Sequence, residues 1–481
     1  MTMDRRLSPI SLALALAACS VGPDYRPQPV RAPAAAPFVN ASAPTLVSDA
    51  RPAGNWWQLY DDPVLNRLVE DALAANTDVK VAEARLERAQ ATLREERVAR
   101  EPQARLAGSA QYGRLSGPAV PGEKRTDFQV DAGLSVAYEV DLFGRINRRI
   151  EAAQGDIGAA DADADAVRVT IVSKTVQAYA DAASLAERIT VAEQIVALLD
   201  QSLALTEKRR EIGLANGLDT ARLAALRDQR RADIPTLEAE RESALLELAT
   251  LTGRSPRELP AQAAVRASTL RLSQPIPVGD GAMLLARRPD VRAAERRLAA
   301  ATARIGVATA DLYPSIALGA SIGSNGSGFG NIFSANPLTW LVGPLISWTA
   351  NRSAGRARVA EAQADSKAAL ATFDGTMLEA LQETETALSN YQQAVRRREA
   401  LRSARDEAEA AARITRARQR EGDISSLELL DAERTAAEAA AALAEADANI
   451  ARAQIDLFRA LGGGWSEGTL SAAAARAAQK G

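Results

Sequence analysis

Two stretches of this chain, residues 75–108 and residues 287–319, carry nearly the same residues in the same order. A shift of 212 positions aligns them, and two helix-ending prolines, Pro102 and Pro314, match under that shift. Matched pairs further along keep a similar spacing: Gly213 and Gly422 are 209 positions apart, and Leu251 and Leu461 are 210 apart. A sequence that repeats at a nearly fixed interval predicts a structural unit that is built twice.

Each copy is predicted to open with a helix. In the first copy, apolar residues from Val64 to Leu93 recur about every 3.6 residues, which is the period of one helix face. Pro63 suits the first turn of this helix, because a residue there needs no backbone N–H. We therefore predict one helix that begins near Pro63 and continues through Leu93.

Two strands are predicted to follow in each copy, because the apolar period changes from 3.6 to two. The clearest strand runs from Phe128 to Tyr138, where apolar residues alternate with polar or small ones. The four predicted strands lie at about 104–112, 128–138, 315–323 and 338–348. Aromatic residues on their apolar faces are expected at the two surfaces of a membrane: Tyr112, Phe128, Tyr138, Trp340 and Trp348.

A very long helix is predicted after each pair of strands. Residues 145–212 and residues 357–421 contain no proline, and each would form about 100 Å of helix. Both stretches stop at a glycine, and a returning helix follows each of them. The expected parts of the chain are a signal peptide (1–18), a lipidated N-terminal tether (19–62), a first repeat (63–253), a linker (254–281), a second repeat (282–464) and a C-terminal tail (465–481).

The N-terminus has the form of a secretory signal. Two arginines precede a short apolar run that ends at the only cysteine, Cys19, and the run is too short to span a bilayer. The sequence LAAC resembles a bacterial lipobox, in which the cysteine becomes the acylated first residue of the mature protein. The alternative is an ordinary signal peptide with an incidental cysteine. By resemblance to known lipoproteins, Ser20 after the cysteine favours the outer membrane.

The composition argues against several classes of function. Alanine supplies much of the 47% hydrophobic fraction and aromatic residues only 4%, a balance typical of long helices packed through small side chains. The net charge of −3 leaves no basic surface for nucleic acid. The chain has no histidine, so Ser-His and Cys-His triads are excluded and no enzymatic activity is expected. The stretches DADADA and GSGFG lack what a calcium or phosphate loop needs, so no metal or cofactor is expected.

The predicted strands set the number of chains. No segment after the signal peptide has about 18 unbroken apolar residues, so no transmembrane helix is expected and any membrane span must consist of strands. Four strands cannot close a membrane barrel, because single-chain barrels begin at eight strands and lipid does not tolerate an open sheet edge. Several chains must therefore share one barrel, and three chains would supply twelve strands.

Five motifs extend the interpretation: LAACSVGPDYRP, WWQLYDDPVLNRLVEDAL, YEVDLFGRINRRIEAAQ, RRPDVRAAERRLAAATARIGVA and ALGGGW. They span nearly the whole chain and resemble the TolC-like outer-membrane factor family, in its lipoprotein branch with OprM and NodT. The resemblance implies a mainly α fold with a homotrimer, a twelve-stranded membrane β-barrel and an α-helical barrel that continues it into the periplasm. The sequence PLISWTANRSAGRAR departs from the family pattern, which leaves the second junction between strand and helix open.

The implied function is the exit duct of a tripartite efflux system that exports drugs or other toxic small molecules. The implied partners are a periplasmic adaptor (a membrane fusion protein), an inner-membrane pump of the resistance-nodulation-division (RND) type and the lipids of the outer membrane. A duct for a type I secretion system or another inner-membrane transporter is the alternative within the same architecture. A lipid-anchored coiled-coil scaffold without a pore is the alternative from another class.

The turns after the long helices are the candidate gate. By resemblance, Asp431 and Glu428 match acidic positions at the closed periplasmic mouth of family members, and Leu427 matches an apolar constriction. Asp219 is expected at the equivalent site of the first repeat. The alternative is that Asp431 and Asp219 only begin the returning helices, where a carboxylate is favoured by the positive end of the helix dipole.

Overall fold

The computed structural model of the protein describes residues 20–29, 32–41, 45–52, 54–114, 126–272, 274–327 and 338–463. The chain divides into two compact units, each assembled from separate stretches of the sequence. Unit 1 takes its described residues from Met1–Gln28, Arg85–Asp161 and Ala293–Gly375, and unit 2 from Pro29–Ala84, Ala162–Arg292 and Thr376–Gly481. Each unit contains parts of both sequence repeats, so the compact units differ from the tandem division expected from the sequence.

The described part of the chain is mainly helical. Its elements in chain order are η1 (Ala32–Ala35), β1 (Val47–Ser48), η2 (Trp56–Tyr60), α2 (Pro63–Ala75), α3 (Thr77–Val98), β2 (Gln103–Arg114), β3 (Thr126–Val140), α4 (Arg145–Glu211), α5 (Gly217–Leu251), η3 (Pro256–Glu258), η4 (Ala261–Ala264), β4 (Ile276–Pro277), α6 (Gly281–Arg287), α7 (Pro289–Ala310), β5 (Ser315–Ser327), β6 (Leu338–Ser347), α8 (Ser353–Glu421) and α9 (Ser426–Ala460). The order helix, two strands, long helix, returning helix occurs twice, as α3 to α5 and as α7 to α9.

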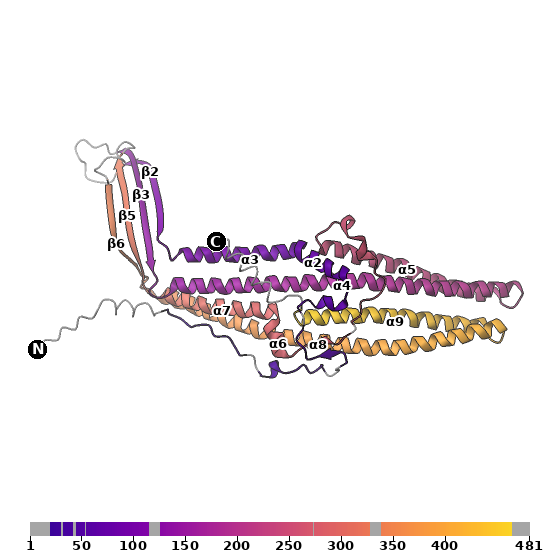
Figure 1. The fold of residues 1–481 in the computed structure, drawn as a ribbon. Coiled ribbons are helices and arrows are strands. Elements are labelled where there is room, and N and C mark those ends of the chain that lie inside the picture. The colour runs from indigo at the N-terminus through magenta and orange to yellow at the C-terminus, as the bar shows by residue number, and fades with distance from the viewer. Residues whose placement is uncertain are drawn as a thin grey trace, which may run out of the picture. The chain divides into compact units, whose positions relative to one another are not determined.

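Unit 1 contains an antiparallel four-stranded sheet in the order β2-β3-β5-β6 (Figure 1). The register pairs Leu106 with Leu134, Leu134 with Ile322 and Ile322 with Trp340. Because neighbouring strands in register present the same face, the apolar residues of all four strands form one continuous surface. Among the described residues, β2 pairs only with β3 and β6 only with β5, so each outer strand keeps one free edge.

The helices of unit 1 approach one another through small residues. A Cβ added to Gly155 of α4 would lie 2.9 Å from Cβ of Ala300 in α7, which is too close for any larger residue. The start of α4 is fixed by Asp141, whose carboxylate accepts hydrogen bonds from the backbone N–H groups of Ile146 (3.0 Å) and Asn147 (2.9 Å). These bonds satisfy donors that a helix leaves unpaired at its N-terminus.

Unit 2 contains the largest hydrophobic core. Trp56 is fully buried and stacks on Phe458 at 4.6 Å between ring centroids, and Tyr179 of α4 is also buried here. The Tyr179 hydroxyl donates to Asp62 at 3.0 Å, and Asp62 also caps α2 through the backbone N–H groups of Val64 and Leu65. The core therefore joins the beginning of α2 to the middle of α4.

The helix predicted from Pro63 through Leu93 is broken in the structure. Asn76 has a non-helical ψ of 137°, and its side-chain oxygen accepts from the backbone N–H of Asp78 at 2.8 Å. Its side-chain amide donates to the carbonyl of Leu251 at 2.9 Å. The apolar period survives the break because α3 starts immediately afterwards, so periodicity alone could not reveal it.

The segment 19–62 was expected to be an extended tether, and much of its described part is packed. Phe38 and Val47 are buried in the core of unit 2, together with Trp56, Trp57 and Tyr60. The carboxylate of Glu385 in α8 accepts from the backbone N–H groups of Val39 (2.6 Å) and Asn40 (3.0 Å). The proline- and alanine-rich composition predicted an extended tether, and the apolar side chains within it are buried against the helices of unit 2. The signal peptide, Cys19 and the tail 465–481 lie outside the described residues.

No helix long and apolar enough to span a membrane was expected, but the structure contains one candidate. Among the described residues, α4 alone has the length and apolar composition required, and 33% of that apolar stretch is buried. Val172, Val176 and Tyr179 of α4 lie in the core of unit 2, so part of the apolar composition of this helix serves packing.

Candidate functional site

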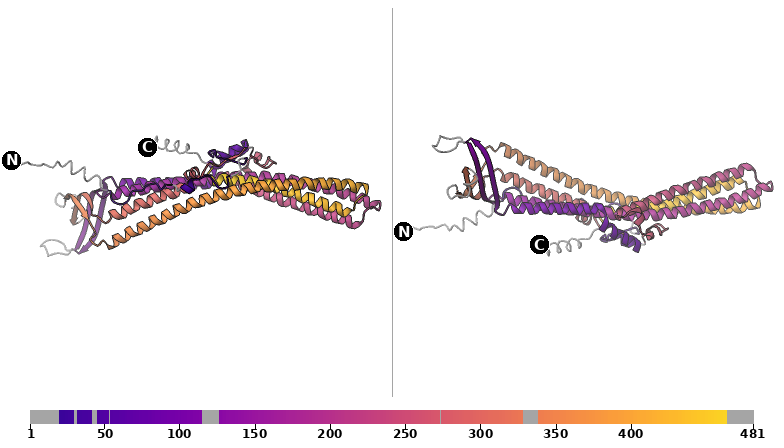
Figure 2. Two further views of the ribbon diagram at one scale, coloured as in Figure 1. Left: turned by 90° about the horizontal axis from the view of Figure 1, so that it is seen from below. Right: turned by 90° about the horizontal axis from the view of Figure 1, so that it is seen from above.

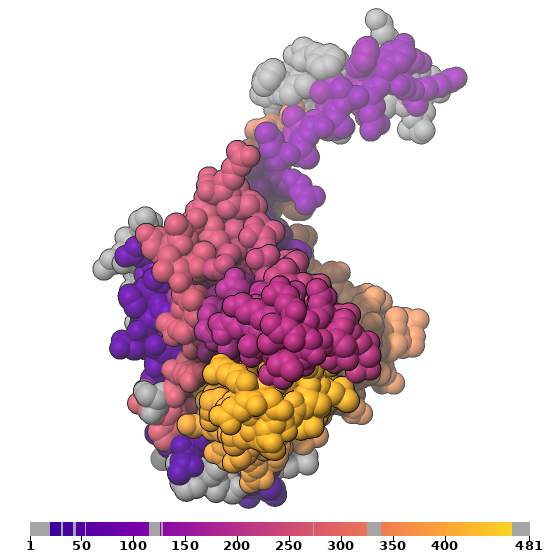
Figure 3. Space-filling model, turned by 90° about the vertical axis from the view of Figure 1, so that its right-hand side faces the viewer, coloured from indigo at the N-terminus to yellow at the C-terminus, as the bar shows by residue number. Residues whose placement is uncertain are grey.

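The turns between the long helices have the same local geometry in both repeats. α4 is followed by Gly213 at φ 79° and α8 by Gly422 at φ 82°, and only glycine adopts this conformation without strain. The N–H of Leu214 donates to the carbonyl of Arg209 at 2.7 Å, and that of Asp423 donates to Arg418 at 3.0 Å. The two turns lie side by side in unit 2, where Figure 3 shows them facing the viewer in magenta and yellow.

The first turn leads into α5 through a capping box. The Asn216 side chain accepts from the N–H of Asp219 at 3.0 Å, and the Asp219 carboxylate accepts from the N–H of Asn216 at 3.2 Å. Asp219 is thus the third residue of its helix and satisfies a backbone donor there. This role is the helix-start alternative that the sequence left open.

The second turn leads into α9 in a similar way, with Glu428 as the third helical residue. The Ser425 hydroxyl accepts from the N–H of Glu428 at 3.3 Å and lies 3.2 Å from its carboxylate. Asp431 is the sixth residue of α9, beyond the first turn, where the helix dipole has little effect. Its side chain is 68% exposed and pairs with Arg434 at 2.9 Å.

We expected Asp219 to be the counterpart of Asp431 in the first repeat. Counting residues from the start of each returning helix gives a different pairing of positions. Counted from the start of each helix, Asp219 is equivalent to Glu428, and Asp431 is equivalent to Arg222. Leu427 is equivalent to Leu218, and both leucines are 56% exposed. The structure therefore places the four expected gate residues at two adjacent turns, with Asp431 the acidic group that helix capping does not explain.

A buried polar network lies behind the turns and was missed by sequence reasoning. Glu433 of α9 is 3% exposed and accepts from Arg416 of α8 at 2.5 and 3.1 Å and from the Ser202 hydroxyl of α4 at 3.0 Å. One carboxylate therefore links three helices. No local sequence signal predicts this, because the partners meet only once the hairpins are paired.

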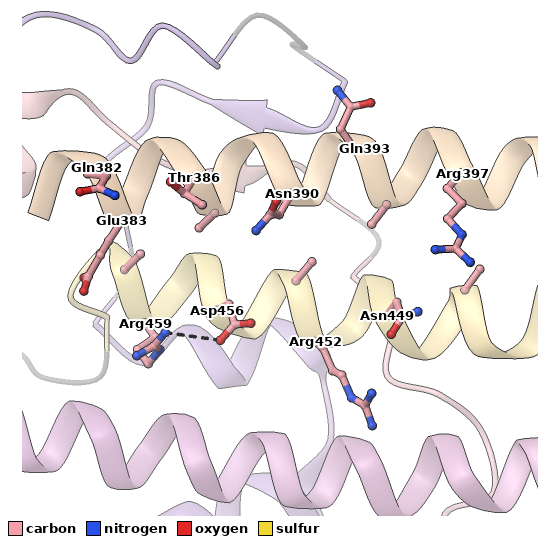
Figure 4. Close-up of a pocket in the computed structure, with 15 residues that line it drawn as sticks. Gln382, Glu383, Thr386, Asn390, Gln393, Arg397, Asn449, Arg452, Asp456 and Arg459 are labelled. Carbon is pink, nitrogen blue, oxygen red and sulfur yellow. Dashed lines mark ion pairs between the residues drawn. The ribbon is translucent and has the colours of Figure 1, made fainter. Parts of the chain in front are cut away.

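A groove of about 620 Å³ runs between α8 and α9 (Figure 4). Its floor is formed by alanines of both helices, and its rim carries polar side chains that include Asn390, Arg397 and Asn449. Arg452 on this rim leaves the groove to pair with Asp181 of α4 at 2.8 Å. The groove contains no arrangement of acids, bases and nucleophiles that would suggest a reaction.

The predicted aromatic residues all lie on the apolar face of the sheet or at its end. Tyr112 contacts Phe128 at 4.9 Å between centroids, in a row at one end of β2 and β3. Tyr138 lies towards the opposite end, and Trp348 follows β6 there and donates to the carbonyl of Leu312 at 3.3 Å. Trp340 shares the row of Leu134, between these ends. All five rings are at least 40% exposed.

The residues immediately after Cys19 pack against α4 and α7 within unit 1. Arg148, only 4% exposed, donates to the carbonyls of Val21 (3.2 Å) and Gly22 (3.3 Å) and to the Asp24 carboxylate (2.7 Å). A Cβ on Gly22 would lie 2.5 Å from Cα of Gly306, so the two backbones touch.

Tyr25 adds a further contact of this N-terminal segment, because its hydroxyl donates to the Glu295 carboxylate at 3.0 Å. Burial, helped by the charge of Glu295, raises the pKa of Tyr25 to about 12, so this hydroxyl stays protonated at physiological pH. The contacts therefore hold the first described residues in one place beside the start of α4.

Comparison with known proteins decides the family. The model of the outer membrane efflux protein family matches residues 68–254 and residues 282–463, well over half of the chain. The chain belongs to the outer membrane efflux protein family.

Similar proteins match this chain over nearly its whole length. The outer membrane protein OprJ of Pseudomonas aeruginosa is 32% identical over 96% of this chain and 96% of its own length. The pyoverdine export outer membrane protein OpmQ of Pseudomonas putida is 30% identical over 97% of this chain and 98% of its own. The solved structure of the outer-membrane channel OprN is 38% identical, with a TM-score of 0.86 over 93% of this chain and 100% of that one.

The function follows from the family. The protein is an efflux duct of the outer membrane in a Gram-negative bacterium, as its sequence motifs predicted. The resemblance stated from those motifs is confirmed.

Proposed function

We propose that three copies of this chain assemble into one duct across the outer membrane and that each contributes four strands to a closed barrel. The observation that carries the proposal is the pair of free edges on a sheet with one apolar face. A free edge in lipid leaves a row of backbone N–H and C=O groups unpaired, which costs several kcal/mol for each group. The edges must therefore pair with something, and another copy of the chain is the simplest partner.

The strand directions suit that pairing. Successive strands of the sheet are antiparallel, so β2 and β6 run in opposite directions. β6 of one copy can then pair in antiparallel fashion with β2 of the next, which is a head-to-tail contact that closes into a ring. Three copies give twelve strands, the number implied by the family resemblance.

The dimensions of the sheet support a membrane position. Phe128 and Tyr138 lie ten residues apart on β3, about 34 Å along the strand and about 26 Å along the normal of a barrel whose strands tilt by about 40°. Membrane barrels have an apolar band about 25 Å tall between aromatic girdles. We assign Tyr112, Phe128, Tyr138 and Trp348 to these girdles, whereas Trp340, in the row of Leu134, falls within the band between them.

The N-terminal lipid anchor belongs to the same proposal. Acylation of Cys19 would place the acyl chains next to Ser20, which contacts Gly144 between β3 and α4. This is the end of the sheet at which its strands continue into helices. Several acyl chains give stable anchoring, where a single chain binds only marginally.

The two adjacent turns are proposed as the periplasmic gate. Three copies would bring three Asp431 carboxylates and three Leu427 side chains to a narrow mouth, with Glu428 and Asp219 at the helix starts. A ring of carboxylates attracts cations, and a ring of leucines narrows the pore without hydrogen bonding. We propose that a periplasmic adaptor opens this mouth by spreading the hairpins and that an RND-type inner-membrane pump supplies small toxic compounds to the duct.

The duplicated element order and the two separate matches of the family model support an internal duplication. In the proposed trimer the two repeats supply six hairpins to the helical barrel. The number of repeats and the number of copies would then together set the width of the duct.

The test is assembly and conduction. Purified protein should run as a trimer before heating and as a monomer after it, and it should conduct ions in a planar lipid bilayer. A coiled-coil scaffold without a pore would give no conductance in any assembly state. The proposal fails if the membrane-extracted protein is monomeric.

A further inference from the structure

The two returning helices have equal length, but only α5 contains a proline. α5 and α9 each contain 35 residues, and the nineteenth residue is Pro235 in α5 and Ala444 in α9. Proline has no backbone N–H and its ring displaces the preceding turn, so the carbonyl of Arg231 has no partner within the helix. Sharp bends in helices occur mainly at such positions.

The packing of α5 is also interrupted at this point. Near the turn, Thr220, Leu223 and Leu226 are buried, and the two leucines pack with Ile195, Leu199 and Leu203 of α4. At the other end, the buried residues are Ala244, Leu248, Ala249 and Leu251. None of the residues from 227 to 243 is buried. Pro235 therefore lies in the middle of the one stretch of α5 that the core does not hold.

A cavity of about 430 Å³ lies beside this stretch, between α4, α5 and α9. Thr236 and Leu237 of α5 line it directly after the proline, and small residues, including Ala442 and Ala444, line it from α9. The hollow opens to solvent, so α5 can move into it without displacing the tightly packed side chains of a core.

The charged groups around the cavity allow such a movement. Arg230 pairs with Glu438 of α9 at 3.2 Å, and Arg188 of α4 lies 4.0 Å from Glu240. Both acidic partners are more than half exposed. Exposed ion pairs contribute little and are remade at little cost, so they would not hold α5 straight.

We propose that Pro235 is a hinge that lets the segment Gly217–Ile234 change its angle to the rest of α5 when the duct opens. This proposal rests on the gate proposed above. When a hairpin bends, its two helices must change length relative to each other. α4 has no proline and can only curve gently, so α5 absorbs the difference at Pro235. The second hairpin has no such position and moves as a straight pair.

Pro235 is thus a positioning residue for the first turn, and Asp219 and Leu218 move with it. The two hairpins of each copy would open by different motions, although their turns have the same local geometry. This asymmetry follows from one residue and one cavity.

Hydrogen exchange of the full-length trimer tests the hinge itself. Backbone amides at 228–240 should exchange faster than those at the matched positions 437–449 of α9. Pro235→Ala restores one helical hydrogen bond and should slow exchange at 228–240 roughly fivefold, the factor that one net hydrogen bond supplies. Thr236→Ala changes the neighbouring residue without adding a backbone donor, so exchange should stay within about twofold of the wild type.

Openings in a planar bilayer test the use of the hinge. Pro235→Ala should lower the open probability roughly fivefold while the heat-stable trimer persists. Ala442→Leu keeps the proline but fills the cavity, and it should lower the open probability in the same direction. A structural role alone would change trimer stability and leave openings of the intact trimer unaltered.

The outcomes separate the two proposals. A wild-type trimer that never conducts removes the proposed duct, whereas exchange at 228–240 still reports on the hinge. The hinge is overturned if 228–240 exchanges as slowly as 437–449. It is also overturned if Pro235→Ala slows exchange but leaves the open probability unchanged.

Discussion

Asp219 is the third residue of its helix and Asp431 is the sixth, so the two carboxylates have different roles. The Asp219 carboxylate completes a capping box, whereas the Asp431 carboxylate is exposed beyond the first turn and pairs with Arg434 of the same helix. In the proposed gate, Asp431 therefore presents an exposed carboxylate in a weak surface pair with Arg434, while the Asp219 carboxylate is hydrogen-bonded to the backbone.

Neutralising Asp431 tests this difference. Asp431→Asn keeps the side-chain shape and removes three charges from the proposed mouth, so cation preference should fall. Asp219→Asn preserves an oxygen for capping and should change cation preference less. The measurement is the reversal potential of single channels in a KCl gradient. Equal shifts for both variants would contradict the assignment of Asp431 as the main charge of the mouth.

Arg148 is the residue that fixes the N-terminal segment. Arg148→Met leaves two backbone carbonyls and the carboxylates of Asp24 and Glu151 without this donor, which costs about 1–3 kcal/mol. The segment should detach more often, and chymotrypsin should cleave after Tyr25 about tenfold faster in membrane-embedded protein. Arg149→Met, one residue further along α4, is the control and should leave the cleavage rate unchanged. If cleavage after Tyr25 is equally fast in the wild type, the segment is not held.

At the scale of elements, Glu433 joins α4, α8 and α9. Glu433 is buried, but the Arg416 side chain is 25% exposed, so removing the carboxylate leaves a partly hydrated charge and the Ser202 hydroxyl without their acceptor. The cost is about 1–3 kcal/mol. Glu433→Ala should therefore lower the melting temperature of the trimer measurably in a thermal denaturation experiment.

The matched control for this prediction is Glu438→Ala. Glu438 also pairs with an arginine of a neighbouring helix, but its side chain is 56% exposed, and such pairs contribute at most about 1 kcal/mol. Equal melting temperatures for the two variants would show that the buried network does not stabilise the hairpins.

Local sequence patterns predict the elements well where the cause of the structure is itself local. The strands follow from a period of two, and the ends of the long helices follow from glycines that adopt positive φ. The break at Asn76 was not predicted, because its side chain caps the next helix without disturbing the apolar period.

Contacts between distant parts of the chain could not be predicted in the same way. Ser202, Arg416 and Glu433 meet only after two hairpins pair, so no spacing in the sequence identifies them. The position of the N-terminal segment likewise depends on hydrogen bonds from Arg148. The neighbours of Arg148 are set by the packing of α4 against α7. For the candidate gate, the family resemblance identified the two turns. The structure then showed that Asp219 occupies the same helix position as Glu428 and not that of Asp431.

At the scale of the whole molecule, the proposed duct needs more than one copy of the chain. In the part of the chain that the structure describes, the sheet has an apolar face, two free edges of opposite direction and strands of 10 to 15 residues, long enough to cross a bilayer. Figure 2 shows the same four strands from two further directions. These properties have a common explanation if neighbouring copies pair edge to edge.

Electron microscopy of the protein extracted from the outer membrane in detergent tests this claim most directly. We predict three copies around one axis, with β6 of each copy hydrogen-bonded in antiparallel fashion to β2 of the next and twelve strands in a closed ring. A particle in which β2 and β6 of one copy remain unpaired, or pair with each other within a single chain, would contradict the account.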